Sequence, residues 1–404
     1  MHKTLVSANT AVIIGAKRTP ISTRGGRLAK VPVENLAAAV ISAVSAEAQK
    51  SLEVQGAGVA IGGVYLGNCM GPGGNLGRVS ALAAGLPLSV PAMTIDTQCG
   101  SSLSAIMTAA SAIESGLIPS GQLAIAGGAE SASTAPTRSI DGVAYSRAPF
   151  APAGFPDPDM GPAAQALAVK HNIARPIQDA YAVRSHDLAS AFGAKGGFEP
   201  EIAMLPELEA DDAPREGMSA MVERFTGLYP DLAPAEVAVT GGNSSRNSDG
   251  AAAVALISNA ARSAGQPGLA IVGMVSIGVN PELPGIGPVA AVTELLNQSG
   301  LTMADITAFE MVEAFAAQTL SVLLGLGLAQ IDTDQPNQLT VDPRVCANGG
   351  ALALGHPWGA SAAVSVVRLF SRLVRGGAPA GSLGIATVAV GGGMGMAVLV
   401  EVVR

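Results

Sequence analysis

Charged residues are scarce in this 404-residue chain: they make up 13% of it, and the formal net charge is −8. Nucleic-acid binding needs clustered Lys and Arg to neutralise phosphates, so this composition argues against a nucleic-acid partner. Cysteine is also rare, and its three widely spaced residues form neither a disulfide framework nor a paired metal-ligand motif. We therefore expect a protein of the reducing cytoplasm that binds no metal.

Hydrophobic residues, by contrast, make up 49% of the chain. This share, over a length that fits two or three domains, predicts a large core and further surface buried in an oligomer. The uncharged run 378–400 is long enough to span a membrane, but its glycines separate two β-branched segments, 383–390 and 394–403. We interpret it as two buried strands and expect no membrane contact. Residues 1–10 lack the pattern of a secretory signal.

Apolar periodicity predicts alternating strands and helices, which is typical of an α/β architecture with covered sheets. One segment differs: residues 131–239 are rich in Pro, Asp and Met, show few strand patterns and read as an inserted subdomain with helices at 163–170 and 178–192. Elsewhere the pattern predicts strands at 12–16, 59–67, 92–96, 122–126, 251–257 and 269–279, and helices at 33–50, 80–86 and 103–115.

Cys99 is the first candidate catalytic residue. It lies in the run Gln98-Cys99-Gly100-Ser101, directly before an apolar helical pattern that Gly116 closes. The unpaired N–H groups and the positive dipole end of a helix N-terminus stabilise thiolate over thiol. The position therefore predicts a nucleophile with a lowered pKa.

His356 is the best candidate for a base among four histidines. His2 lies at the chain terminus, and His171 and His186 lie in polar helical segments where a solvated side chain is expected. His356 instead follows a glycine-rich loop and precedes the turn Gly359-Ala360-Ser361 and an apolar helix. A histidine there can act as a base or as an oxyanion donor, although a hydrogen-bonded capping residue is the alternative.

A faint internal repeat relates the regions around the two candidates. Each has a loop, a small-residue turn, an apolar helix and a Gly-x-Leu-x-Ile-Ala strand, at 121–126 and 381–386. Two similar halves would place Cys99 and His356 at equivalent helix starts that face each other. The run Gly391-Gly392-Gly393-Met394-Gly395 fits no nucleotide fingerprint, and we expect its backbone N–H groups to form an oxyanion hole.

Taken together, the motifs resemble those of the thiolase family over nearly the whole chain. Their order and spacing are more specific than any one of them. The matching segments are residues 18–20 (RTP), 98–101 (QCGS), 127–131 (GGAES), 159–161 (DMG), 242–245 (GNSS), 249–251 (DGA), 285–288 (GIGP), 313–316 (EAFA), 355–357 (GHP) and 391–395 (GGGMG).

The resemblance implies an α/β thiolase fold: two similar βαβαβαββ halves in a five-layer α-β-α-β-α core with an inserted loop domain. The N-terminal half would comprise residues 1–128 and 250–266, the loop domain that covers coenzyme A residues 129–249, and the C-terminal half residues 267–404. It also implies acyl-CoA substrates, no permanently bound cofactor, and a homodimer or homotetramer.

The resemblance further assigns roles to individual residues. Cys99 would carry the acyl group as a thioester, His356 would activate it, and the N–H groups of Cys99 and Gly391 would form the oxyanion hole. Candidate contacts to coenzyme A or its acyl group are Ser245, Arg215 and Met160.

Two departures from the family pattern touch the reaction itself. Thiolases carry a second cysteine just before the glycine turn, which moves the proton at the acceptor's α-carbon; here that position is Ala389. The residue before Glu-Ala-Phe, usually Asn or His, serves the oxyanion hole of the acceptor thioester; here it is Val312. Arg246 and Pro284 are smaller departures, and the bulk of Arg246 puts the usual coenzyme A pose in doubt.

Neither of two other residues is a strong replacement for the missing base. Cys346 is expected to be a small buried hydrophobe, and Glu313 to be structural. Three functions stay open: an acyl-CoA C-acyltransferase that performs Claisen condensation or thiolysis, a specialised acyltransferase with a non-standard acceptor (or a Cys-to-Ala altered thiolase), and a non-catalytic CoA-binding partner. Intact Cys99 and His356 argue against the third.

Overall fold

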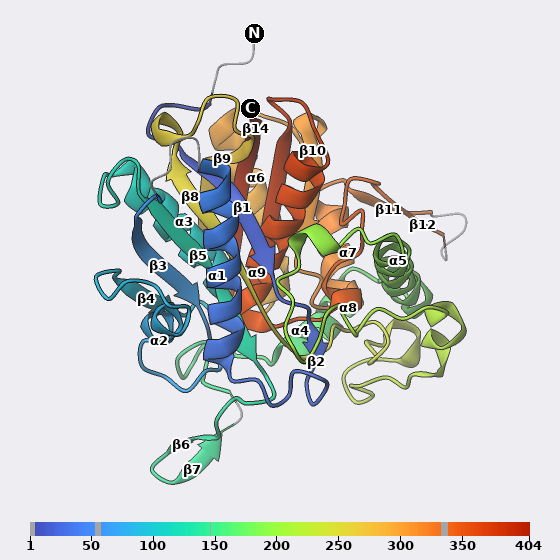
Figure 1. The fold of residues 1–404 in the computed structure, drawn as a ribbon. Coiled ribbons are helices and arrows are strands. Elements are labelled where there is room, and N and C mark those ends of the chain that lie inside the picture. The colour runs from blue at the N-terminus through green and yellow to red at the C-terminus, as the bar shows by residue number, and fades with distance from the viewer. Residues whose placement is uncertain (1–4, 53–57, 146, 333–337) are drawn as a thin grey trace.

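The computed structural model describes residues 5–52, 58–145, 147–332 and 338–404. Within them, ten strands form one mixed sheet in the order β10-β13-β14-β9-β1-β8-β5-β3-β4, with β2 beside β8 (Figure 1). The sheet consists of two halves, which meet where β1 pairs with β9 at Val12–Ala270 and Ile13–Leu269. The first half contains β1 (Ala11–Arg18), β2 (Ser22–Thr23), β3 (Ile61–Gly67), β4 (Ala92–Ile95), β5 (Leu123–Ser131) and β8 (Ser248–Ser258). The second contains β9 (Gly268–Gly278), β10 (Ile306–Met311), β13 (Leu383–Val390) and β14 (Met394–Val403).

Helices cover both faces of each half-sheet and give five layers. Helices α3 (Ser101–Glu114) and α9 (Trp358–Leu369) pack together between the halves. Helices α1 (Val33–Leu52) and α2 (Leu76–Ala83) cover the outer side of the first half. Helix α6 (Gly287–Ser299), with α7 (Ala316–Gly325) beside it, covers the second. The hydrophobic core is divided accordingly into a central cluster and two outer ones. The α/β five-layer architecture expected from the sequence is confirmed.

The segment between β5 and β8 is largely irregular, as expected. Its hairpin, β6 (Arg138–Ile140) and β7 (Val143–Tyr145), projects from the body of the molecule (Figure 1) and was not predicted. Its remaining elements are α4 (Met160–Lys170), α5 (Arg175–Gly193), η1 (Glu199–Glu201), η2 (Met218–Ala220), η3 (Val222–Arg224) and η4 (Ala235–Val237). The later short elements are η5 (Asn259–Ala261), η6 (Pro284–Ile286), η7 (Met303–Asp305), β11 (Ala329–Ile331), β12 (Leu339–Val341), α8 (Ala351–Leu354) and η8 (Phe370–Arg375).

Most predicted elements lie within a few residues of the observed ones, and the differences have local causes. Helix α2 begins four residues before its predicted start because the Asn75 side chain accepts a hydrogen bond from the N–H of Arg78 and caps it. Helix α3 ends at Glu114; Ser115 is its C-cap, and Gly116 follows in the left-handed region (φ 78°). The uncharged run 378–400 contains β13 and most of β14, as expected. Among the described residues, no helix has both the length and the apolar character needed to cross a membrane.

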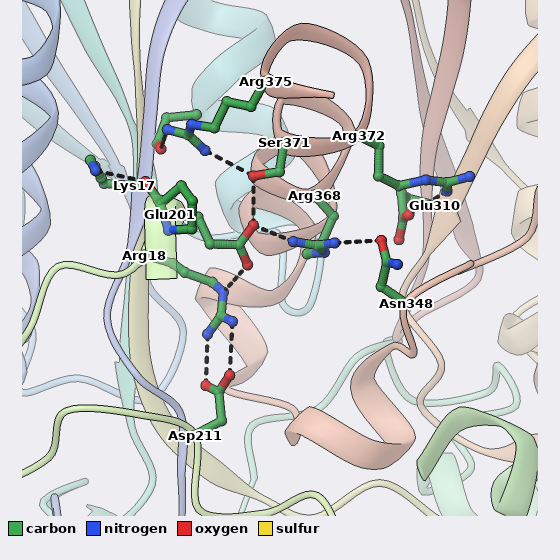
Figure 2. A network of polar contacts seen from close by, with 12 residues as sticks. Lys17, Arg18, Glu201, Asp211, Glu310, Asn348, Arg368, Ser371, Arg372 and Arg375 are labelled. Atoms are coloured by element: carbon green, nitrogen blue, oxygen red, sulfur yellow. Dashed lines mark hydrogen bonds and ion pairs between the residues drawn. The ribbon is translucent and has the colours of Figure 1, made fainter. Parts of the chain in front are cut away.

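Glu201 of the inserted segment anchors a buried ionic network to both halves of the core (Figure 2). Its carboxylate accepts hydrogen bonds from Arg18 Nε of β1 (2.7 Å), from Arg368 of α9 and from Ser371 Oγ (2.6 Å). Arg18 also makes a bidentate pair with Asp211, at 2.7 and 2.8 Å. Burial alone would raise the pKa of Glu201, but Arg368 and Arg18 outweigh it and the pKa is lowered.

We expect Glu201→Ala to lower the free energy of unfolding by about 3–5 kcal/mol, because it leaves a buried guanidinium without its carboxylate. Urea denaturation measures this, with Glu282→Ala on the exposed surface as the control. Because its folded-state pKa is lowered, Glu201 stabilises the fold above its unfolded-state pKa of about 4.3, and this contribution is lost as the pH falls below that value. Equal unfolding midpoints for the two variants would contradict the prediction.

Candidate active site

One cavity of about 230 Å³ brings together most of the candidate residues. The candidate nucleophile and base, Cys99 and His356, both line it. So do the two residues that depart from the family pattern at catalytic positions, and three further candidates: Ala389, Val312, Gly391, Ser245 and Met160. Arg215 is the exception: it is exposed and does not line this cavity. The catalytic and binding roles of these eight residues stay predictions.

A tight turn between β4 and α3 carries Cys99 to the cavity wall. Gln98 has a positive φ of 52°, which is uncommon for a residue with a side chain. The turn is held by hydrogen bonds from the N–H of Gln98 to Asp96 Oδ1 (2.9 Å) and from Ser101 Oγ to the Gln98 carbonyl (2.6 Å). Such backbone strain is kept where surrounding contacts over-determine it, and here it positions the candidate nucleophile.

The expectation of a lowered Cys99 pKa is wrong. Burial, followed by the nearby Glu130 carboxylate, raises the pKa of Cys99 to about 12, although its own backbone N–H acts in the opposite direction. Helix α3 begins only at Ser101, so the thiol precedes the N-terminus instead of lying within its first turn. Cys99 is therefore a thiol at neutral pH and needs a base.

His356 has the protonation state that such a base requires. Burial lowers the pKa of its imidazole to about 4, so the ring is neutral at physiological pH. Ser361 Oγ lies 2.6 Å from Nδ1 and fixes the ring orientation. The His356 N–H donates to the Arg246 carbonyl (2.9 Å), which ties the loop before α9 to the segment before β8. His171 is exposed and His186 buried, both outside this cavity, whereas His2 lies outside the described residues.

Ala389 and Val312 form an apolar part of the wall on the second half-sheet. Ala389 lies in β13, and Val312 directly follows β10, the parallel neighbour of β13. The backbone N–H of Val312 donates to the Thr387 carbonyl (3.2 Å), so the wall is fixed by the sheet itself. Neither side chain can donate or accept a proton.

Glu313 and Cys346 do not line the cavity. Glu313 is fully buried and accepts hydrogen bonds from Tyr181 Oη (2.8 Å) and Ser185 Oγ (2.7 Å). Cys346 is also fully buried, with its sulfur 3.6 Å from the Met311 carbonyl. These positions agree with the expectation that Glu313 is structural and that Cys346 is a small buried hydrophobic residue.

Arg246, whose bulk puts the usual coenzyme A pose in doubt, does not line the cavity. Its guanidinium donates to the Ala213 carbonyl (3.1 Å), while its neighbours Ser245 and Asn247 line the cavity. Burial, followed by repulsion from Arg215, lowers the pKa of Arg246. Arg246 therefore leaves the cavity open.

Several lining residues were not identified from the sequence. Cys69 follows β3, and its position at the carboxyl end of a strand was an available signal. Arg138 begins β6, and Arg147 and Phe150 lie in irregular backbone after β7; no periodicity in the sequence indicates that these residues reach the cavity. Phe150 packs against Gly391, where an added Cβ would lie 2.9 Å from the ring. Within the described ranges, no group of three or more His, Cys, Asp or Glu side chains is placed to hold a metal ion.

Comparison with known proteins decides the family. The profile of the thiolase N-terminal domain matches residues 11–260, and that of the thiolase C-terminal domain matches residues 266–402. The chain belongs to the thiolase family. It is a thiolase-like acyltransferase with a mixed α/β fold.

Individual thiolases are similar over almost their full length. A Bacillus subtilis (strain 168) protein with the provisional name acetyl-CoA C-acetyltransferase is 39% identical over 398 residues, 97% of this chain and 99% of that protein. A 3-ketoacyl-CoA thiolase of Citrobacter koseri is 36% identical, over 97% of this chain and 99% of the relative. The crystal structure of the Bacillus anthracis acetyl-CoA acetyltransferase superposes with a TM-score of 0.83 at 31% identity, covering 98% and 99% of the two chains.

Proposed function

We propose that this thiolase is an acyl-CoA C-acyltransferase that carries the acyl group on Cys99 as a thioester and exchanges it with coenzyme A. The observation that carries the proposal is the shared cavity of a thiol with a raised pKa and a neutral imidazole. A protonated thiol is a weak nucleophile until a base removes its proton. His356 is that base, and Claisen condensation or thiolysis of a 3-ketoacyl-CoA is the overall reaction.

Acylation uses the groups in the cavity wall. Cys99 gives its proton to His356 and attacks the thioester carbon of acyl-CoA. The N–H groups of Cys99 and Gly391 hold the developing oxyanion, and Met160 lines the acyl pocket. Coenzyme A leaves as a thiol with a proton from the cavity wall, and His356 gives its proton back to the Cys99 sulfur when the acyl group is transferred onward.

The inserted segment, residues 129–249, covers coenzyme A. Ser245 lies in the cavity wall at the end of this segment and contacts the pantetheine arm. Arg215 lies outside the cavity, close enough to Arg246 for mutual repulsion, which suits the phosphate-bearing end of the same substrate. Residues 1–128 with 250–266 and residues 267–404 are the two halves of the core, and coenzyme A enters only as substrate.

The assembly is a homodimer or homotetramer, and the compartment is the cytoplasm. Strand β4 is an edge strand of the sheet, and Val79, Leu88 and Met93 on and near it are exposed large hydrophobic side chains. Exposed apolar groups on an unpaired edge are what a second copy would cover. Three free cysteines suit a reducing compartment.

A second candidate is transfer of the acyl group from Cys99 to a non-standard acceptor. It is favoured by Ala389 and Val312, whose apolar side chains supply neither the proton-transferring thiol nor the oxyanion donor of the family pattern. An acceptor more acidic than acetyl-CoA, or an oxygen or nitrogen nucleophile, depends less on a proton-transferring side chain in that part of the wall.

Isotope exchange tests the proposal. Acetyl-CoA and labelled coenzyme A are incubated with the protein, and label appears in acetyl-CoA only if an acyl-enzyme forms and reverses. We expect exchange by the unaltered chain and by Cys346→Ala, and none by Cys99→Ala. Exchange that survives in Cys99→Ala would contradict the proposal. Formation of 3-ketoacyl-CoA after adding acceptor then separates the first candidate from the second.

A further inference from the structure

Three adjacent parallel strands of the first half-sheet bring three reactive side chains to one edge. The strands lie in the order β5-β3-β4. Glu130 is near the end of β5, Cys69 follows β3, and Cys99 follows β4. Carboxyl ends of parallel strands meet at the same sheet edge, which is where ligands bind in open α/β sheets. A second thiol thus lies beside the proposed nucleophile.

Cys69 is held by Glu130 and belongs to the cavity wall. Its sulfur lies 2.9 Å from Glu130 Oε2, and Cys69 is among the residues that line the cavity. Glu130 is fully buried and accepts further hydrogen bonds from Asn68 Nδ2 (2.9 Å) and the N–H of Gly359 (3.2 Å), which connects it to the start of α9. The carboxylate cannot turn away, so it fixes the position of the Cys69 thiol.

Cys69 is protonated in the resting site and becomes a strong base once it loses its proton. Burial, followed by the Glu130 and Cys99 charges, raises the pKa of Cys69 well above its ordinary value. A thiolate formed there lies beside a carboxylate, and like charges favour reprotonation. Such a group gives its proton readily to a very basic atom, such as a carbanion, and its thiolate readily takes a proton back from a thiol.

No other lining residue is free for this role. The titratable groups among the cavity-lining residues are Cys69, Cys99, His356, Arg138 and Arg147. In the proposed function Cys99 carries the acyl group and His356 serves Cys99. Arginine does not release its proton in proteins. Cys69 is the remaining titratable residue of the cavity wall.

We infer that Cys69 is the catalytic residue that moves the proton at the α-carbon of the acceptor, in place of the thiol that Ala389 cannot supply. This inference rests on the proposed function and assigns its carbon–carbon step. It gives the first half-sheet the chemistry that the family pattern places on the second.

The proton balance closes without any further reactant. In thiolysis the Cys99 sulfur attacks the 3-keto carbon while its proton passes to His356. The bond to the α-carbon breaks, its electron pair stays on the α-carbon, and the Cys69 S–H gives that carbon its proton. Coenzyme A then gives its thiol proton to the Cys69 thiolate and attacks the acyl carbon. The Cys99 sulfur leaves and takes back its proton from His356.

Deuterium incorporation tests this step separately from acylation. The protein is incubated in deuterated water with acetyl-CoA, and label in the methyl group is measured by mass spectrometry beside acetylation of Cys99. We expect Cys69→Ala to lower methyl exchange by at least about 100-fold while Cys99 acetylation is retained. Cys69→Ser keeps a hydrogen bond to Glu130 but has a far less acidic proton, so it should lose exchange as well. Cys346→Ala, outside the cavity, should match the unaltered chain.

Rescue supplies the decisive control. Adding Ala389→Cys to Cys69→Ala should restore exchange, because it returns a thiol to the same cavity from β13. Exchange that persists in Cys69→Ala, full activity in Cys69→Ser, or no exchange by an unaltered chain that acetylates Cys99 would each overturn the inference. Absence of Cys99 acetylation in the unaltered chain would instead overturn the proposed function. Retained Cys99 acetylation in the Cys69 variants shows that they fold.

Discussion

Replacing His356 by alanine is expected to slow acylation of Cys99 by a factor of about 10²–10⁴, the usual contribution of a positioned base. The physical reason is the protonation state of the pair. The thiol has a pKa raised to about 12 and the imidazole a pKa lowered to about 4, so proton transfer must accompany attack. Stopped-flow release of coenzyme A from acetyl-CoA measures the rate.

The pH profile distinguishes a base from a structural histidine. With His356 present, the acylation rate should be flat from about pH 5 to pH 9 and fall as the pH approaches 4, where the imidazole becomes protonated. In His356→Ala the reaction depends on free thiolate, so the rate should rise about tenfold for each pH unit over that range. His171→Ala, on the exposed surface, is the matched control and should leave the profile unchanged. A flat profile in His356→Ala would contradict the assignment.

Replacing Val312 by asparagine is expected to raise the rate of thiolysis of acetoacetyl-CoA by about 100-fold, because one oxyanion donor is worth about 10²–10³ in rate. Val312 lines the cavity beside β13, where the acceptor thioester would lie. A side-chain amide there supplies the donor that valine lacks. Steady-state assays with saturating coenzyme A measure the gain.

Val312→Ala separates the donor from the added space. It enlarges the same part of the wall without adding a hydrogen bond, so we expect no gain from it. Acylation of Cys99 should be unchanged in both variants, because in the proposed function the acyl carbonyl is bound by the N–H groups of Cys99 and Gly391. Equal gains in the two variants would show that the valine acts by its bulk and would refute its assignment as a missing donor.

The strands and helices of the layered core could be predicted from the sequence, because the apolar periodicity of each segment matches the secondary structure that it adopts there. The β-branched runs of β13 and β14 were found within a residue, and the repeat around Cys99 and His356 anticipated two helices that start at one cavity. These features depend on periodicity and on glycine positions, which a single chain displays directly.

The electrostatics of the site depend on contacts that no local pattern records. The Cys99 pKa is set by burial and by Glu130, which arrives from another strand. Cys69 meets Glu130 across 61 residues, and the Arg246 guanidinium turns toward Ala213, 33 residues earlier in the chain. Side chains of the insert reach the cavity through irregular backbone. Such contacts exist only once the halves and the insert are packed together.

Peptide mass spectrometry shows directly whether Cys99 carries the acyl group. The protein is quenched in acid within one turnover with acetyl-CoA, digested, and examined for an acetyl group on each cysteine-containing peptide. We expect one acetyl group on the Cys99 peptide, formed at least as fast as overall turnover and removed when coenzyme A is added. An unmodified Cys99 peptide during turnover, or acetyl on the Cys69 or Cys346 peptide in its place, would contradict this expectation.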